Sequence, residues 1–207
     1  MVIGSDLSLI QRKHELPNLE FVQHDVELDE WQFGAPFDYI HMRYIVTCFD
    51  NTKAVFQNAY DNMNAGGWIE FFDADMDLKS PDGSFQGTAI ERWGKLLLQG
   101  GQKRGRDLLR PRLFADWCRD IGFEDVHEEI VPLPNNGWPE DPKMRAIGEL
   151  YTANLIGLVD SFTKFLTLAG LSRTEAVELE TQAKKDIQNP DIHFVVSTHI
   201  VYARKPL

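Results

Sequence analysis

Apolar residues along the chain follow two spacings, which predict alternating strands and helices. Short apolar runs predict strands at residues 1–6, 19–27, 37–41, 68–72, 126–133 and 192–202. Apolar residues at helical spacing predict amphipathic helices near residues 54–63, 90–97, 111–121, 141–165 and 172–179. This alternation is typical of an α/β fold.

The segment at residues 54–72 joins one of these helices to a buried strand. Gly66 and Gly67 lie between the two, where a left-handed turn at a helix end favours a residue without a Cβ atom. The strand at residues 37–41 comes before the helix. The helix is therefore predicted to be the crossover of a parallel βαβ unit.

Helix boundary signals beyond residue 80 predict two helical insertions. Gly100 and Gly101 are expected to end the helix near residue 90. Asp141 is a suitable N-cap with Pro142 at the first helical position, and the helix it begins is expected to continue toward Gly170. We therefore expect one domain over residues 1–207, with a helical cap formed by residues of about 80–121 and 141–188.

Charge and composition narrow the class of partner. The 207 residues carry a net charge of −11, which argues against a partner held by phosphate contacts such as a nucleic acid. Cys48 and Cys118 lie among apolar neighbours and are expected to be buried free thiols. There is no apolar run of about 18 residues, so we expect no membrane span and a cytoplasmic protein with a small-molecule substrate.

The order of several motifs resembles the second to fifth strands of class I S-adenosylmethionine-dependent methyltransferases, most closely the branch found in fungal secondary metabolism. The similarity covers nearly the whole chain. The segments that carry it are residues 2–8, 19–27, 37–43, 64–71, 105–107, 137–142 and 192–206. It implies a Rossmann-like, mostly parallel sheet with an antiparallel last strand and a helical cap.

The resemblance also implies that the family's first strand and its glycine-rich cofactor loop are absent from the sequence. In the family that strand lies centrally, between the second and the fourth. Its absence would leave backbone groups unpaired, each costing roughly 1–3 kcal/mol if buried. Either the second strand closes on the fourth, or another copy of the chain supplies a strand or a cover. The second alternative predicts a homodimer.

Three residues match the family's cofactor positions. Asp6 closes its strand where the family's acid accepts hydrogen bonds from the cofactor ribose, and Asp25 with Val26 matches the position beside the adenine. Either acid could instead cap a local turn. Without the glycine-rich loop, nothing is expected to hold the methionine carboxylate, so we expect no bound cofactor.

Two histidines and an arginine are the candidate catalytic residues. His41 and Arg43 follow one strand at its carboxyl edge, where open α/β sheets bind ligands. His193 begins the antiparallel last strand and is expected at the same edge. A histidine there could move a proton, and Arg43 could polarise a carbonyl. His199 is expected to lie deeper and to be structural.

Other side chains are candidates for contacting the substrate: Met42, Asp73, Trp138 and Phe162. Asp73, Asp75 and Asp77 alternate as metal ligands would, but such acids are more typical of a solvated edge, so no metal is expected. A basic cluster is either a solvated loop or an anchor for a carboxylate or enolate. Its members are Lys103, Arg104, Arg106, Arg110 and Arg112.

Three functions are compatible with these features. The first is a methyltransferase-derived enzyme that has lost methyl transfer and catalyses a cofactor-independent cyclisation, pericyclic reaction or isomerisation of a secondary metabolite. The second is a working S-adenosylmethionine-dependent methyltransferase whose cofactor loop is supplied in trans or is missing from the sequence. The third is a non-catalytic partner of an intact methyltransferase. The sequence favours the first.

Overall fold

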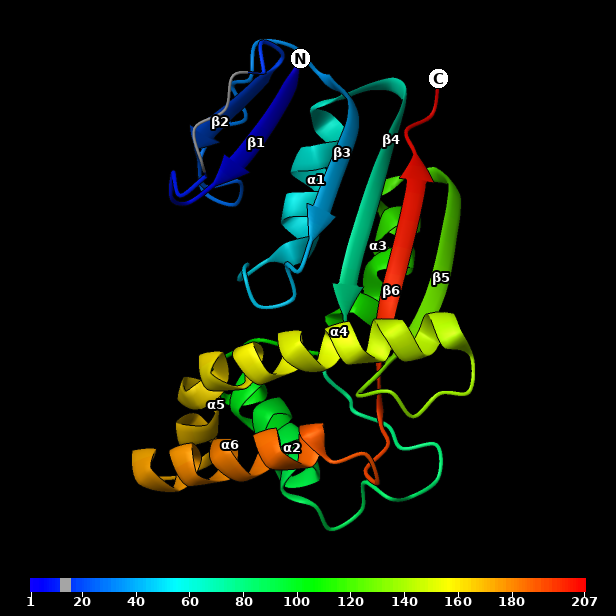
Figure 1. Cartoon of the computed structure of the whole chain (residues 1–207). Helices are drawn as coiled ribbons and strands as arrows, with labels where there is room; N and C mark the ends of the chain where they lie inside the picture. Colours follow the sequence, from blue (N-terminus) through cyan, green and yellow to red (C-terminus); the bar gives the residue numbers. More distant parts are fainter. Residues whose placement is uncertain (12–15) are drawn as a thin grey trace.

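The strands form two separate groups in the computed structural model (Figure 1). The structure describes residues 1–11 and 16–207. β1 and β2 pair in parallel, and a second sheet has the order β3-β4-β6-β5, in which only β6 runs opposite to its neighbours. The predicted α/β fold with an antiparallel last strand is confirmed. In chain order, the elements are β1 (Val2–Asp6), β2 (Leu19–Gln23), β3 (Phe37–Arg43), α1 (Thr52–Asp61), β4 (Met63–Ala74), α2 (Ala89–Lys103), the 3-10 helix η1 (Arg110–Leu113), α3 (Phe114–Ile121), β5 (Glu124–Pro134), α4 (Pro142–Val159), the 3-10 helix η2 (Asp160–Phe162), α5 (Thr163–Ala169), α6 (Arg173–Gln188) and β6 (Val195–Arg204).

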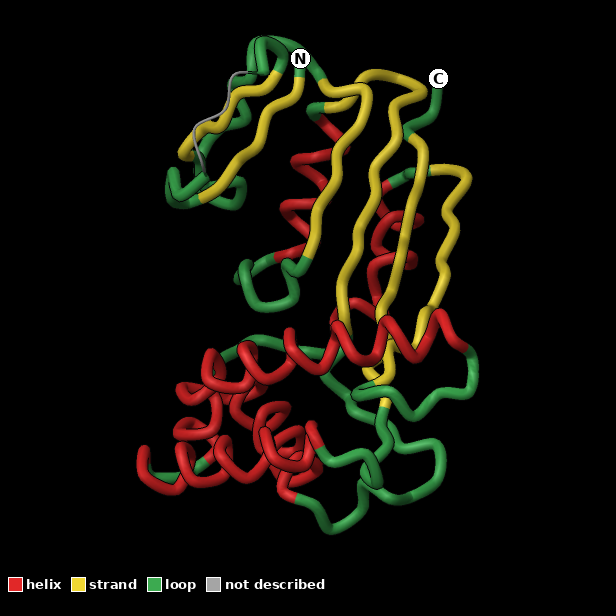
Figure 2. Tube along the Cα trace, in the orientation of Figure 1, coloured by secondary structure: helices red, strands yellow, loops and turns green. Residues whose placement is uncertain are grey.

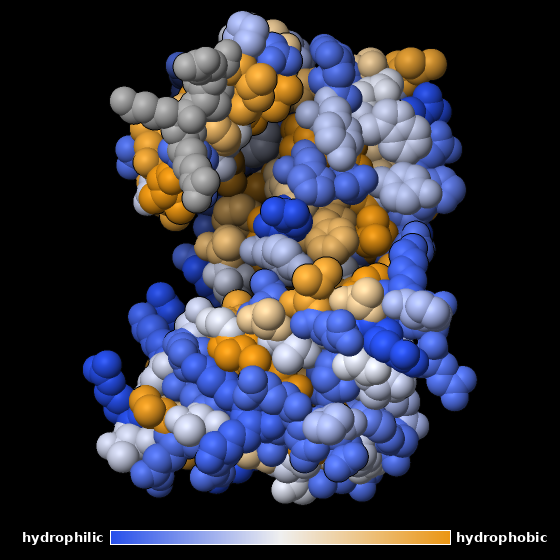
Figure 3. Space-filling view, in the orientation of Figure 1, coloured by the Kyte–Doolittle hydropathy of each residue, from blue (hydrophilic) through white to orange (hydrophobic). Residues whose placement is uncertain are grey.

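A gap separates β1 from β3. Within the described residues, no backbone hydrogen bond joins these two strands, and each pairs on one side only. Figure 3 shows a hollow between the β1–β2 pair and the four-stranded sheet, with hydrophobic residues in its depth. The alternative in which the second strand closes on the fourth is therefore wrong. Two strand edges remain available for pairing.

These edges lead us to expect self-association. Multi-angle light scattering at micromolar concentration should give about twice the chain mass of 23.7 kDa. Tyr39→Lys, on the uncovered face of β3, should shift the mass toward that of the monomer. Leu150→Lys, on an exposed part of α4, serves as the control and should not. A wild-type mass near 23.7 kDa would refute the dimer.

A loop after β2 links the two sheets. The Glu27 carboxylate accepts hydrogen bonds from the backbone N–H groups of Asp50 (3.1 Å) and Asn51 (2.6 Å), just before α1. The Phe33 and Phe37 rings meet edge to face with centroids 5.3 Å apart. The β1–β2 pair is thus attached through side chains and a loop, without a shared strand ladder.

Helices cover only one face of the four-stranded sheet. Phe56 of α1 and Phe114 of α3 pack with Phe71 of β4 in a core that lies behind the strands in Figure 1. On the opposite face Tyr39 is 53% exposed and Trp68 is 37% exposed. One side of the sheet is therefore open over β3 and β4.

The helices α2, α4, α5 and α6 form a lobe at one end of the sheet (Figure 2). Gly100 and Gly101 were expected to end α2, but both lie within it. A Cβ atom at Gly100 would be 1.9 Å from the Phe165 carbonyl oxygen, so the glycine allows α2 and α5 to approach closely. The predicted long helix is also interrupted, at residues 160–162, where the Thr163 hydroxyl donates to the Asp160 carbonyl.

Gly66 and Gly67 also have a different role from the one expected. α1 ends at Asp61, and both glycines lie in the first part of β4. Gly66 has a φ of 77°, and a Cβ at Gly67 would be 3.1 Å from the Asp38 carbonyl oxygen. The pair bends the chain against β3, which requires residues without side chains.

The expectations for the two cysteines and for the insertion at residues 80–121 have mixed outcomes. Cys48 and Cys118 are both free, but Cys48 is exposed and only Cys118 is buried. Among the described residues, no helix has the length and apolar character needed to cross a membrane. The predicted insertion at residues 80–121 divides between two places, because α2 joins the helical lobe whereas α3 packs on the sheet.

Candidate functional site

Two acidic residues lie at the carboxyl ends of the paired strands: Asp6 ends β1, and Asp25 lies two residues after β2. Asp6 Oδ1 accepts a hydrogen bond from Ser8 N–H at 2.9 Å, and Asp25 Oδ1 accepts one from Glu27 N–H at 2.9 Å. Each carboxylate therefore caps a local turn. In the described part of the chain, the second oxygen of each makes no hydrogen bond. Both acids combine a structural role with an oxygen that can still accept a hydrogen bond.

The open face of the four-stranded sheet carries aligned rows of polar and aromatic side chains. His41 lies opposite Glu70, which lies opposite Tyr202 and then His127. The His127 and Tyr202 rings stack with centroids 5.1 Å apart. The neighbouring rows are Tyr39, Trp68 and Arg204 on one side and Arg43, Phe72 and Ile200 on the other. We call these three rows the open-face site.

Glu70 orients the imidazole of His41. Glu70 Oε1 is 3.0 Å from His41 Nδ1, and the Tyr39 ring stacks on the imidazole at 6.5 Å. Burial, followed by the charge and hydrogen bond of Glu70, raises the pKa of Tyr39. Among the described residues, none forms a hydrogen bond with His41 Nε2. The carboxylate thus favours a proton on Nδ1 and leaves Nε2 of this 40% exposed side chain as an acceptor.

Arg43 provides an uncommitted positive charge two residues along the same strand. Its guanidinium lies over the Tyr44 ring, 5.9 Å from the centroid. Across the described chain it forms no ion pair. A carboxylate or enolate of a ligand could therefore bind it without displacing a protein partner.

His193 does not meet His41 and Arg43, contrary to the expected cluster. Arg43 lies opposite Phe72, which lies opposite Ile200 of the last strand. His193 precedes Ile200 by seven residues. At the strand rise, this separation is roughly 20 Å. The regular strand begins at Val195, and the His193 ring bonds to Asp82 at 2.6 Å and to the Pro190 carbonyl at 2.8 Å. It holds the loops beside the helical lobe together.

The predicted substrate contacts are also dispersed. Met42 alternates with His41 and packs on the core behind the sheet. Phe162 is buried in the helical lobe. Trp138 stacks on His193 with centroids 5.2 Å apart. The structure places none of the three on the open-face site.

Asp73 is fully buried at the end of β4. Its carboxylate accepts hydrogen bonds from Ile45 N–H at 2.7 Å and Ala74 N–H at 2.8 Å. Burial raises its pKa to about 6 against the effect of these bonds. It fixes the turn after β3, and it has no exposed surface with which to contact a substrate.

Beside it, His199 lies between two carboxylates, which agrees with its expected structural role. His199 Nε2 is 3.3 Å from Asp75 Oδ2, and Nδ1 is 2.8 Å from Glu128 Oε1. The hydrogen bond to Asp75 is the main cause of the raised pKa of His199. Burial raises the pKa of Asp75, but the bonds from His199 and Arg112 outweigh it and leave that pKa lowered. These groups form a charged network around the buried side chains of His199 and Asp75.

Two members of the basic cluster make contacts within the protein. Arg110 is buried and donates to the Phe49 carbonyl and to Thr52 Oγ1. Arg112 pairs with Asp75 and Asp77 at 2.7 Å each. Within residues 1–11 and 16–207, no three His, Cys, Asp or Glu side chains are grouped so that they could hold a metal ion.

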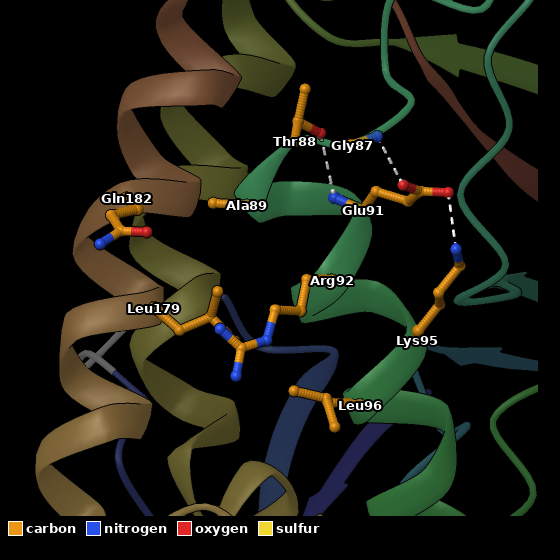
Figure 4. A pocket seen from close by; sticks show the side chains of 9 residues that line it. All are labelled: Gly87, Thr88, Ala89, Glu91, Arg92, Lys95, Leu96, Leu179 and Gln182. Carbon is orange, nitrogen blue, oxygen red and sulfur yellow. Dashed lines mark hydrogen bonds and ion pairs between the residues drawn. The ribbon is translucent and has the colours of Figure 1, made fainter.

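A groove of about 470 Å³ lies between α2 and α6 (Figure 4). Glu91 at its rim is already engaged, since it bonds to Gly87 N–H and to the Lys95 ammonium. The groove belongs to the helical lobe and contains none of the predicted site residues. Its lining is Gly87, Thr88, Ala89, Glu91, Arg92, Lys95, Leu96, Leu179 and Gln182.

Sequence patterns did not identify Glu70 or Tyr39 as site residues. The available signal was strand parity, because Tyr39, His41 and Arg43 alternate along one strand and must share a face. The position of Glu70 opposite His41 depends on the register between β3 and β4. That register shifts between Phe37 and Tyr39, which no local pattern predicts.

Comparison with known proteins identifies related sequences. Residues 1–128 match a family described as a methyltransferase domain. The methyltransferase pytC of Aspergillus terreus is 28% identical over 209 residues, a match that covers all of this chain and 64% of the relative. The chain thus spans less than two thirds of the length of pytC.

Two further proteins are similar over nearly the whole chain. The secondary metabolism regulator LAE1 of Cochliobolus heterostrophus is 29% identical over 216 residues, covering 99% of this chain and 69% of the relative. The YcgJ protein of Bacillus subtilis aligns in structure with a TM-score of 0.47 at 13% identity, covering 99% of this chain and 82% of that one.

Proposed function

Because the chain belongs to this methyltransferase-domain family, we propose that it is an enzyme that methylates a small molecule of secondary metabolism with S-adenosylmethionine as donor. The observation that carries this proposal is that Asp6 ends β1, which borders the gap, and that Asp25 follows the neighbouring parallel strand β2 at the same edge. The family match extends across both sides of that gap. The name of pytC supports the reaction class.

The described residues fit one half of that cofactor. The free oxygens of Asp6 and Asp25 could accept bonds from the ribose and adenine half, with Val26 alongside. The methionine half needs a glycine turn after a strand, and the glycine nearest the gap with positive φ, Gly34, precedes β3 instead. The bound cofactor would supply an electrophilic methyl group. A complete site requires a strand and loop between β1 and β3.

This fit predicts weak cofactor binding by the 207-residue chain. Isothermal titration with S-adenosylmethionine should give a dissociation constant far above the low micromolar range. Asp6→Ala should weaken the residual binding about tenfold, because one bond to a charged acceptor is lost. Asp116→Ala, which removes an exposed carboxylate on α3, is the matched control. Low-micromolar binding of S-adenosylmethionine by the wild type would contradict the inference that these residues hold only the ribose and adenine half of the cofactor.

A cofactor-independent isomerisation or cyclisation is the second candidate. The paired His41 and Glu70 favour it, because an oriented imidazole can move a proton without a cofactor. It ranks second here because His193, the third member of the expected site, lies elsewhere. Turnover of a substrate in the absence of S-adenosylmethionine would reverse the order.

A further inference from the structure

The open-face site combines three chemical functions on adjacent positions of a rigid sheet. His41 offers a proton acceptor at Nε2, Arg43 offers a positive charge, and Phe72 opposite Arg43 offers an aromatic ring. Strand pairing fixes their relative positions, because His41 and Arg43 lie on β3 and Phe72 lies opposite Arg43 on β4. None of these side chains is needed to fill a core.

We propose that the open-face site binds a planar aromatic acid, with its carboxylate on Arg43 and an acidic hydroxyl on His41 Nε2. The hydroxyl proton passes to Nε2 and leaves a phenolate, while Glu70 holds the resulting imidazolium through Nδ1. Atoms and charge balance in this single transfer. Glu70 is a positioning residue, since it acts only through His41.

The spacing of the strand selects the substrate class. Residues two apart on one face are separated by roughly 7 Å, which is about the distance between para substituents across a benzene ring. The aromatic ring would then lie between the rows of His41 and Arg43, beside Phe72, which lies opposite Arg43. An acid with a para hydroxyl group therefore fits better than an aliphatic acid.

The charges around the site agree with this orientation. Glu70 is the acidic group nearest His41, and it would repel a carboxylate placed there. Arg43 lies one row away, opposite the apolar Phe72, and among the described residues no acid pairs with it. The carboxylate is therefore directed to Arg43 and the neutral hydroxyl to His41.

The inference rests on the proposed function only in taking the substrate to be a small molecule. A suitable probe is 4-hydroxy-3-nitrobenzoate, whose phenolate absorbs at longer wavelength than its phenol. Bound to the wild-type chain, it should show more phenolate than free probe at the same pH. Cofactor binding is measured separately, so failure of one proposal leaves the other intact.

Variants separate the three roles. Arg43→Met should weaken probe binding about tenfold but leave the bound probe ionised. His41→Gln should abolish the increase in phenolate. Glu70→Gln should raise the pH at which half of the bound probe is ionised, which the loss of a purely structural residue would not do. Glu70→Asp should reverse part of that rise. Trp138→Phe, in the loop that packs on His193, is the control.

Two results would overturn the proposal. One is saturable binding with the same phenolate fraction in His41→Gln as in the wild type. The other is no binding of the probe at millimolar concentration by a wild-type chain that is folded by circular dichroism.

Discussion

Replacement of His199 by Gln is expected to lower the free energy of unfolding by about 3–5 kcal/mol near pH 6. The imidazole is 3% exposed and separates the carboxylates of Asp75 and Glu128. Glutamine can donate to only one of them in the same space. Two negative charges would then face each other with one donor between them, since Arg112 reaches Asp75 but not Glu128.

The pH dependence of this loss identifies its cause. The pKa of His199 is raised in the folded state above its ordinary value of 6.5. The stabilisation from its charge is therefore fully present below pH 6.5 and is lost as the pH rises through the folded pKa. Urea unfolding of His199→Gln should approach the wild type at alkaline pH.

His127→Gln is the matched control for this experiment. His127 is exposed on β5 and stacks on Tyr202, so its replacement should change stability by no more than about 0.5 kcal/mol. A deficit in His199→Gln that stays constant from pH 6 to pH 9 would mean that packing, rather than charge, explains the loss.

Gly100→Ala should destabilise the protein by about 3 kcal/mol, although alanine is the better helix former. The added Cβ would lie 1.9 Å from the Phe165 carbonyl oxygen, and backbone cannot move aside as a side-chain tip can. α2 and α5 would have to separate. The apolar contacts of Leu97 and Leu166 in the lobe core would then be strained.

Gly157→Ala tests the same substitution without the close approach. Gly157 lies in α4 with no atom near the added Cβ, so the change should stabilise the protein by about 0.5–1 kcal/mol. Both variants are compared by urea denaturation. Equal effects at the two positions would show that the α2–α5 contact does not depend on glycine.

Local sequence signals predicted the elements whose ends are determined locally. Asp141 and Ser172 cap α4 and α6 as expected, and Gly122 ends α3 with a φ of 110°. Each signal acts through hydrogen bonds or dihedral angles within a few residues. The strand pattern was equally informative, because burial on a sheet imposes apolar runs.

Contacts between distant segments were the part that the sequence could not predict. Gly67 and Gly100 were each expected to end a helix, but they allow close approach to β3 and to α5. His193 was placed by assuming that β6 begins there, whereas a side chain 111 residues away, Asp82, binds it in a loop. Glu70 became a site residue only through the register of β3 against β4.

The attachment of β1 and β2 through Glu27 has a consequence for ligand binding. Asp6 and Asp25 belong to one hydrogen-bonded unit, while Arg43 belongs to another. A ligand that touches both must restrict their relative motion, and this costs conformational entropy. The first ligand that joins the β1–β2 pair to the four-stranded sheet pays this entropy cost, and the next ligand does not. A ligand in the hollow is therefore expected to raise the affinity of the open-face site without any change of fold.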